Sequence, residues 1–170
     1  DECFASVVVG DPASHIGVRF LPATRGEDAD ATQSVRSQLV GDLGRRIPEL
    51  RHTFDAAVAV SAALAVVEPY SSGIGGGGFW LLHRARDGRQ VMLDGRERAP
   101  LAAHRDLYLD ESGDVVPGLS MDGPLAAAIP GEPAALAHLA EHYGRVPLAT
   151  SLAPAIRLAE TGFEVDDHYR

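Results

Sequence analysis

The sequence predicts an α+β fold in which one antiparallel hairpin packs with apolar helices. An alanine-rich segment at 55–67 precedes two short strand patterns at 79–83 and 90–93, and two amphipathic helical patterns follow at 132–143 and 147–161. A hairpin with helices before and after it is typical of layered α+β domains. With 170 residues, the chain is long enough for one domain with a hydrophobic core.

The first half of this layout rests on local signals. Alanine favours a helix at 55–67, and Asp55 in its first turn suits the helix dipole. The pair Asp87-Gly88 predicts a tight turn between the two strands. A second turn is expected at 111–114, and the apolar run 125–129 is predicted to be a buried strand.

The two C-terminal helices are predicted from their apolar faces. The face of 132–143 consists of Leu136, Leu139, Ala140 and Tyr143. The face of 147–161 consists of Leu148, Leu152, Ala155, Ile156 and Ala159. Gly144 and Gly162 are expected to end these helices, and Pro154 either kinks the second helix or marks its true start.

The most unusual segment is Gly73-Ile74-Gly75-Gly76-Gly77-Gly78. It satisfies G-x-G-x-x-G, but a dinucleotide site requires a strand before the glycines and a helix after them. Here the predicted helix comes first and the strand second. The run is therefore predicted to pack backbone against backbone at a corner of the sheet and to bind no phosphate.

Several longer motifs identify a family resemblance. They are Glu68-Pro69-Tyr70-Ser71-Ser72 with the glycine run, Leu93-Asp94-Gly95-Arg96-Glu97-Arg98-Ala99-Pro100, Pro130-Gly131-Glu132, Tyr143-Gly144-Arg145-Val146-Pro147, and residues 152–163. Their identity and order resemble the large subunit of gamma-glutamyltranspeptidases from Thr53 to the end. The chain, 1–170, thus resembles the N-terminal part of one such domain.

The front of the chain follows the family less closely. Segments 7–9, 12–14 and 17–21 resemble the family's opening strand and first helix. The Gly-Gly-Asn expected just before Asp55 is missing, and the polar stretch 24–52 stands in its place. This stretch is interpreted as an atypical insertion, expected to lie outside the core, or as a gene-model error. The absence of lysine and asparagine fits GC-rich coding and leaves both interpretations open.

The resemblance implies the four-layer αββα sandwich of N-terminal-nucleophile hydrolases, with no cofactor. In this family a precursor cuts itself before a threonine, which then attacks the amide of glutathione or another gamma-glutamyl donor. The glutamyl group passes to water or to an amino-acid or peptide acceptor. That threonine opens the small subunit of the same precursor, downstream of the residues matched here. The threonines of this chain lie in no matching context: Thr24, Thr32, Thr53, Thr150 and Thr161.

Arg96 is the predicted substrate-binding residue, and no catalytic residue is predicted. The resemblance places Arg96 in an Arg-Glu-x-Ala-Pro motif whose arginine holds the donor's α-carboxylate. A guanidinium can bind a carboxylate through two parallel hydrogen bonds. By composition alone Arg96 would be one surface arginine among 15. Glu97 either orients Arg96 or forms a separate pair, and Arg98 is expected to face solvent.

Two other functional hypotheses remain. His138-Leu139-Ala140-Glu141-His142 satisfies the H-x-x-E-H pattern of certain zinc hydrolases. These polar side chains lie opposite the apolar face of their helix, however, which favours a solvated surface at 138–142 and no metal site. The third hypothesis is a non-catalytic family member or a truncated product.

Composition limits the possible partners but does not determine the compartment. A net charge of −9 without any basic run argues against nucleic acid and anionic membranes. The longest apolar stretch, 56–67, is about half of what spans a bilayer, so no transmembrane segment is expected. No signal-peptide pattern is visible at Asp1, although the resemblance implies a periplasmic or extracellular location. A single cysteine, Cys3, permits no internal disulfide and leaves the compartment undetermined.

Overall fold

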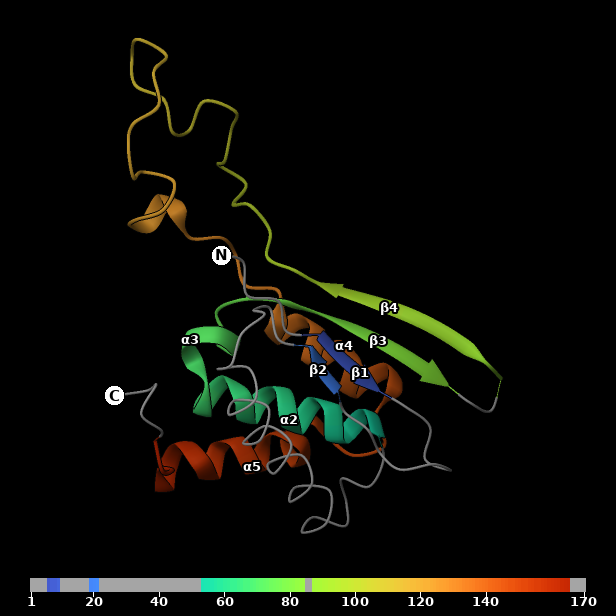
Figure 1. Cartoon of the computed structure of the whole chain (residues 1–170). Helices are drawn as coiled ribbons and strands as arrows, with labels where there is room; N and C mark the ends of the chain where they lie inside the picture. Colours follow the sequence, from blue (N-terminus) through green and yellow to red (C-terminus); the bar gives the residue numbers. More distant parts are fainter. Residues whose placement is uncertain (1–5, 10–18, 22–52, 85–86, 166–170) are drawn as a thin grey trace.

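The computed structural model describes residues 6–9, 19–21, 53–84 and 87–165, and it packs helices against one face of a sheet (Figure 1). The strands are β1 (Ser6–Val9), β2 (Arg19–Leu21), β3 (Gly78–Arg84) and β4 (Arg89–Gly95). The helices are α2 (Thr53–Val67), α3 (Pro69–Ser72), α4 (Glu132–Tyr143) and α5 (Leu148–Thr161), with a short 3-10 helix η2 (Pro124–Ala126). The α+β layout predicted from the sequence is confirmed.

The sheet has the strand order β2-β1-β3-β4, with β1 parallel to β3 and the other pairs antiparallel. The predicted hairpin is formed by β3 and β4, and Gly88 adopts φ +65° at its turn. The expected opening strand at 7–9 lies within β1. The expectation of a first helix is wrong at Arg19–Leu21, because this segment pairs with β1 as a strand. Residues 24–52 lie outside the described residues.

The hydrophobic core lies between the sheet and α2 and α4. Trp80 and Leu82 of β3 are each 2% exposed and pack with buried side chains of both helices. The Trp80 indole donates a hydrogen bond of 3.4 Å to the Ser61 hydroxyl on α2. On the opposite face of the sheet, Leu81 and Met92 are 42% and 65% exposed. Because one face of the sheet is buried and the other exposed, the described residues form one sheet with its helical layer.

The two C-terminal helices are confirmed, with corrections to their details. In α4 the predicted face is buried at Leu136, Leu139 and Ala140, and the helix ends at Gly144, which has φ −71° instead of a left-handed conformation. α5 packs against α2 on the side away from the sheet, as Figure 1 shows. Its buried residues are Ser151, Pro154 and Ala155, whereas Ile156 is 50% exposed. The buried stripe is therefore rotated from the predicted one. The residues buried where α5 packs against α2 are the small side chains of Ser151, Pro154 and Ala155. Pro154 lies inside the helix and does not start it.

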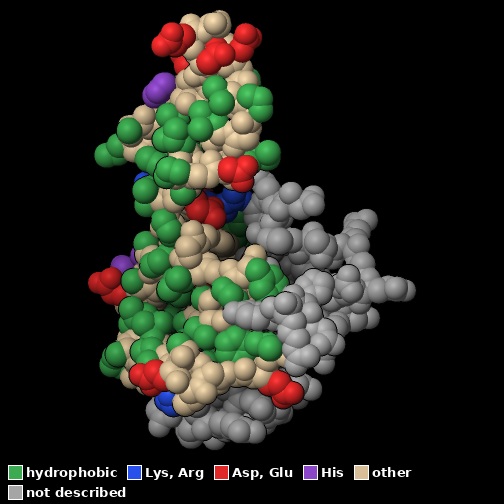
Figure 2. Space-filling model, turned by 90° about the vertical axis from the view of Figure 1, so that its left-hand side faces the viewer, with side chains coloured by type: hydrophobic (Ala, Val, Ile, Leu, Met, Phe, Trp, Pro, Cys, Tyr) green, Lys and Arg blue, Asp and Glu red, His purple; other side chains and the backbone are tan. Residues whose placement is uncertain are grey.

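A long extension leaves the sheet after β4 and returns at α4 (Figure 1). The turn predicted at 111–114 is present, with Gly113 at φ +87° and with Asp110 accepting hydrogen bonds from the backbone of Ser112 and Asp114. The buried strand predicted at 125–129 is wrong. Residues 124–126 form η2 with no buried residue, and Ile129 is 55% exposed in an isolated bridge to Arg98. Figure 2 shows hydrophobic side chains along this extension and acidic ones at its tip.

Within the described residues, no helix is both long enough and apolar enough to cross a membrane. α2 is the longest of these helices, with 15 residues. Its residues are almost all buried, because it lies between the sheet and α5 in Figure 1. Its apolar sequence is therefore used for packing inside the domain.

Candidate functional site

Three glycine-containing segments meet where β4 ends, and they fix the backbone on both sides of Arg96. A Cβ atom on Gly77 would overlap the carbonyl oxygen of Gly95 and would lie 2.9 Å from Cα of Arg96. A Cβ atom on Gly131 would overlap the carbonyl oxygens of both Gly95 and Arg96. Only glycine permits so close an approach of two backbones. We call this arrangement of residues 76–77, 95–97 and 131–132 the glycine junction.

Hydrogen bonds close the junction. The carbonyl oxygen of Gly76 accepts bonds of 3.1 Å from the N–H of Gly131 and 3.2 Å from the N–H of Glu132. The predicted packing of the glycine run at a sheet corner is confirmed, with helices before the run and β3 after it. Close approach of backbones explains the glycines of this corner, and an unusual backbone conformation does not, because the described glycines with positive φ all lie outside 73–78.

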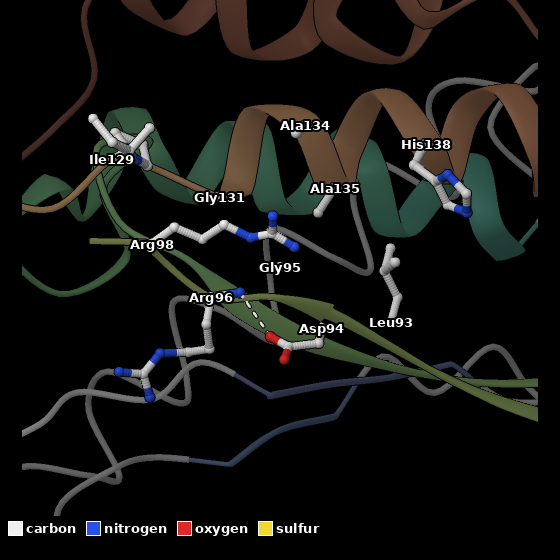
Figure 3. A pocket seen from close by; sticks show the side chains of 11 residues that line it. Leu93, Asp94, Gly95, Arg96, Arg98, Ile129, Gly131, Ala134, Ala135 and His138 are labelled. Atoms are coloured by element: carbon white, nitrogen blue, oxygen red, sulfur yellow. Dashed lines mark hydrogen bonds between the residues drawn. The ribbon is translucent and has the colours of Figure 1, made fainter. Parts of the chain in front are cut away.

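Arg96 follows β4 directly, and its side chain points away from α4 (Figure 3). Its guanidinium carbon lies 6.0 Å from the centre of the Phe79 ring. Its Nε donates a hydrogen bond of 3.0 Å to Oε2 of Glu97, and its backbone N–H donates one of 3.0 Å to Asp94. Of the two alternatives for Glu97, the structure shows direct contact with Arg96. The backbone, a carboxylate and an aromatic ring thus all restrict the orientation of Arg96.

A cavity of about 370 Å³ lies on the other side of β4, between that strand and α4. Arg96 faces it with its backbone only, whereas the side chain of Arg98 extends across it toward Gly95 and Gly131 (Figure 3). Arg98 is exposed, as expected. The two arginine side chains therefore lie on different sides of the strand, and this cavity is separate from the predicted substrate-binding side chain.

Glu132 is a buried acid that the sequence analysis did not identify. It opens α4 and is 7% exposed. Burial raises its pKa to about 7, and the nearby negative charge of Glu97 acts in the same direction. The sequence did contain a signal for this site: Pro130-Gly131-Glu132 places a carboxylate at the start of a helix, and that start packs against the glycine run.

The H-x-x-E-H pattern lies on the solvent side of α4. His138, Glu141 and His142 are exposed, and the two imidazole rings stack with centres 4.0 Å apart. In the part of the chain that the structure describes, no group of three or more His, Cys, Asp or Glu side chains is placed to hold a metal ion. The zinc hypothesis is thus unsupported.

Solved structures define the class of protein. The chain superposes on Helicobacter pylori gamma-glutamyltranspeptidase with a TM-score of 0.71 and 44% identity, covering 76% of this chain and 37% of that one. It matches the Pseudomonas nitroreducens gamma-glutamyltranspeptidase complexed with L-DON with a TM-score of 0.64 and 43% identity, over 68% of this chain and 34% of that one. The fold is the N-terminal portion of the αββα sandwich of N-terminal-nucleophile hydrolases.

Sequence comparisons identify the family. The gamma-glutamyltranspeptidase family model matches residues 52–170. The glutathione hydrolase proenzyme of Pseudomonas sp. (strain A14) is 46% identical over 68% of this chain, and that of Escherichia coli K12 is 42% identical over 66%. The chain belongs to the gamma-glutamyltranspeptidase family. It spans about a fifth of the length of these two relatives, 20% and 19%.

Proposed function

We propose that this chain is the N-terminal part of the large subunit of a gamma-glutamyltransferase and glutathione hydrolase. The proposed enzyme takes the gamma-glutamyl group from glutathione or a similar donor and passes it to water or to an amino-acid or peptide acceptor. Family membership supports this reaction. The matched relatives are proenzymes by name, which supports a self-cleaving precursor. The chemistry uses no cofactor.

Arg96 binds the donor's α-carboxylate in this proposal. The observation that supports it most is the position of Arg96 at the end of β4, on the side away from α4 and oriented by Glu97 and Phe79. In a sandwich of two sheets, this side faces the interior between them. An arginine there can bind a carboxylate through two hydrogen bonds in a partly desolvated place, which makes the contact strong.

The nucleophile comes from a threonine of the small subunit, cut from the same precursor. We infer that this partner covers the sheet face where Leu81 and Met92 are 42% and 65% exposed. Burying these side chains would contribute to assembly through the hydrophobic effect. The chain of residues 1–170 alone is therefore expected to be inactive and prone to aggregation.

The test compares residues 1–170 with a longer gene product that includes the downstream segment. Self-cleavage is followed by mass spectrometry, and release of the gamma-glutamyl group is measured with glutathione. We expect both reactions in the longer product and neither in the shorter chain. Steady turnover by pure residues 1–170, or a longer product that folds and cleaves itself but releases nothing from any gamma-glutamyl donor, would contradict the proposal.

A further inference from the structure

Glu132 is a buried titratable group for which the proposed reaction has no use. It is 7% exposed, and it lies in the first turn of a helix that otherwise buries only apolar side chains: Ala135, Leu136, Leu139 and Ala140. Burying a carboxyl group is unfavourable unless a polar partner compensates it. Its position in the glycine junction suggests what that partner is.

The side chain of Glu97 lies near Gly76, the glycine to which the backbone of Glu132 bonds. The Glu132 N–H bonds to the carbonyl oxygen of Gly76, and Oε1 of Glu97 would lie 3.4 Å from a Cβ atom on that same Gly76. The backbone of Gly131, just before Glu132, packs closely against the backbone of Arg96, because a Cβ atom on Gly131 would overlap the Arg96 carbonyl oxygen. The start of α4 and the Arg96–Glu97 pair are therefore one packed unit.

We propose that Glu132 is a positioning residue that supports Glu97 from the helix side, so that Glu97 holds Arg96 by its Nε edge. The inference rests on the proposed role of Arg96 in donor binding. Oε2 of Glu97 accepts the Arg96 bond, and Oε1 faces the junction where Glu132 begins its helix. Glu132 then acts on substrate only through Glu97 and Arg96.

The protonation of Glu132 agrees with this role. Burial and the charge of Glu97 raise the pKa of Glu132 to about 7, so a large part of it carries a proton near neutrality. A protonated carboxyl group is a hydrogen-bond donor, and a neighbouring carboxylate is the strongest acceptor for it. A neutral donor of the same shape should therefore replace Glu132.

The experiment uses the longer, self-cleaved protein and three substitutions. Glu132→Met keeps the length of the side chain and removes its polar end, Glu132→Gln keeps a donor, and Glu141→Met is the matched control on an exposed part of the same helix. We expect Glu132→Met to raise the KM for the gamma-glutamyl donor about two- to tenfold with kcat nearly unchanged, as for loss of one hydrogen bond in a binding contact. Glu132→Gln and Glu141→Met should keep the KM of the unsubstituted enzyme.

The same measurements in an Arg96→Ala background separate the possible failures. There Glu132→Met should add nothing to KM, because its effect passes through Arg96. If Arg96→Ala raises KM but Glu132→Met does not, the positioning role is wrong and the role of Arg96 stands. If Arg96→Ala leaves KM unchanged, both are wrong. Should Glu132→Met fail to fold, Glu132→Asp withdraws the carboxyl group by one methylene, and an unchanged KM in that variant overturns the inference.

Discussion

Nε of Arg96 donates a hydrogen bond of 3.0 Å to Oε2 of Glu97, its immediate neighbour in the chain. The two side chains are 39% and 29% exposed, so solvent screens much of their attraction. The pair therefore contributes to the orientation of the guanidinium more than to the stability of the fold. For the self-cleaved enzyme, Glu97→Ala should raise the donor KM about two- to fivefold, which corresponds to roughly 0.4–1 kcal/mol. Steady-state kinetics with an unchanged KM would show that Glu97 does not orient Arg96.

The glycine junction should tolerate substitution at one position and not at another. Gly77→Ala forces a methyl group into the backbone at Gly95 and Arg96, whereas a Cβ atom on Gly75 meets nothing within 4 Å. We expect Gly77→Ala to lower the free energy of unfolding by about 1–3 kcal/mol or more, as overpacking does. Gly75→Ala is the matched control and should change it little. Urea unfolding measures both, and equal effects would contradict the assignment of the junction.

Asp55 is another buried acid, with a structural role. It is 0% exposed, and its carboxylate accepts hydrogen bonds of 3.0 Å and 3.4 Å from the backbone N–H groups of Arg145 and Val146. Asp55→Ala leaves these donors without their acceptor, which costs about 2–4 kcal/mol in total. Asp106→Ala, at an exposed acid that bonds the neighbouring Arg105, is the control. Thermal unfolding should show a large loss of stability for the first variant only.

The free energy of unfolding should fall as pH rises, because of Glu132. Its pKa rises from 4.5 to about 7 on folding, so between these values the folded state binds more protons than the unfolded state. The contribution of Glu132 to the free energy of unfolding therefore declines as pH rises through this interval, by about 3 kcal/mol in total. Glu132→Gln should abolish this decline. Urea unfolding across the interval tests it, and parallel pH curves for both proteins would show that the pKa is not raised.

Local patterns predicted the elements that local chemistry determines. The alanine-rich helix α2, the Asp87-Gly88 turn of the hairpin and the glycine ending α5 each follow from a few adjacent residues. The order of helix and strand around the glycine run was enough to predict a packing corner. In contrast, the apolar run 125–129 is no guide to burial, because Pro124 and the positive φ of Gly123 turn the chain into η2 on an exposed extension.

Contacts between distant segments could not be read from periodicity. Asp55 suited the first turn of a helix, but its bond to the Arg145 backbone spans 90 positions and depends on how α2 meets the end of α4. Likewise, Arg96 was predicted from its motif, whereas Glu132 was missed because its place beside Glu97 exists only when α4 packs on β4. An amphipathic pattern shows which face is buried, and it does not specify the partner.

We propose that Arg96 binds the α-carboxylate of the gamma-glutamyl donor. The most direct test is kcat/KM for such a donor in the longer, self-cleaved enzyme carrying Arg96→Ala, with Arg98→Ala as a matched control on the other side of the strand. Loss of one partner of a desolvated charge pair costs roughly 2–5 kcal/mol, so Arg96→Ala should lower kcat/KM by about thirtyfold or more. Arg96→Lys should restore only part of this, because an ammonium group cannot form both parallel bonds. We expect kcat/KM of the Arg98→Ala enzyme to stay near the unsubstituted value, and an Arg96→Ala enzyme with unchanged kcat/KM would contradict the proposed role of Arg96.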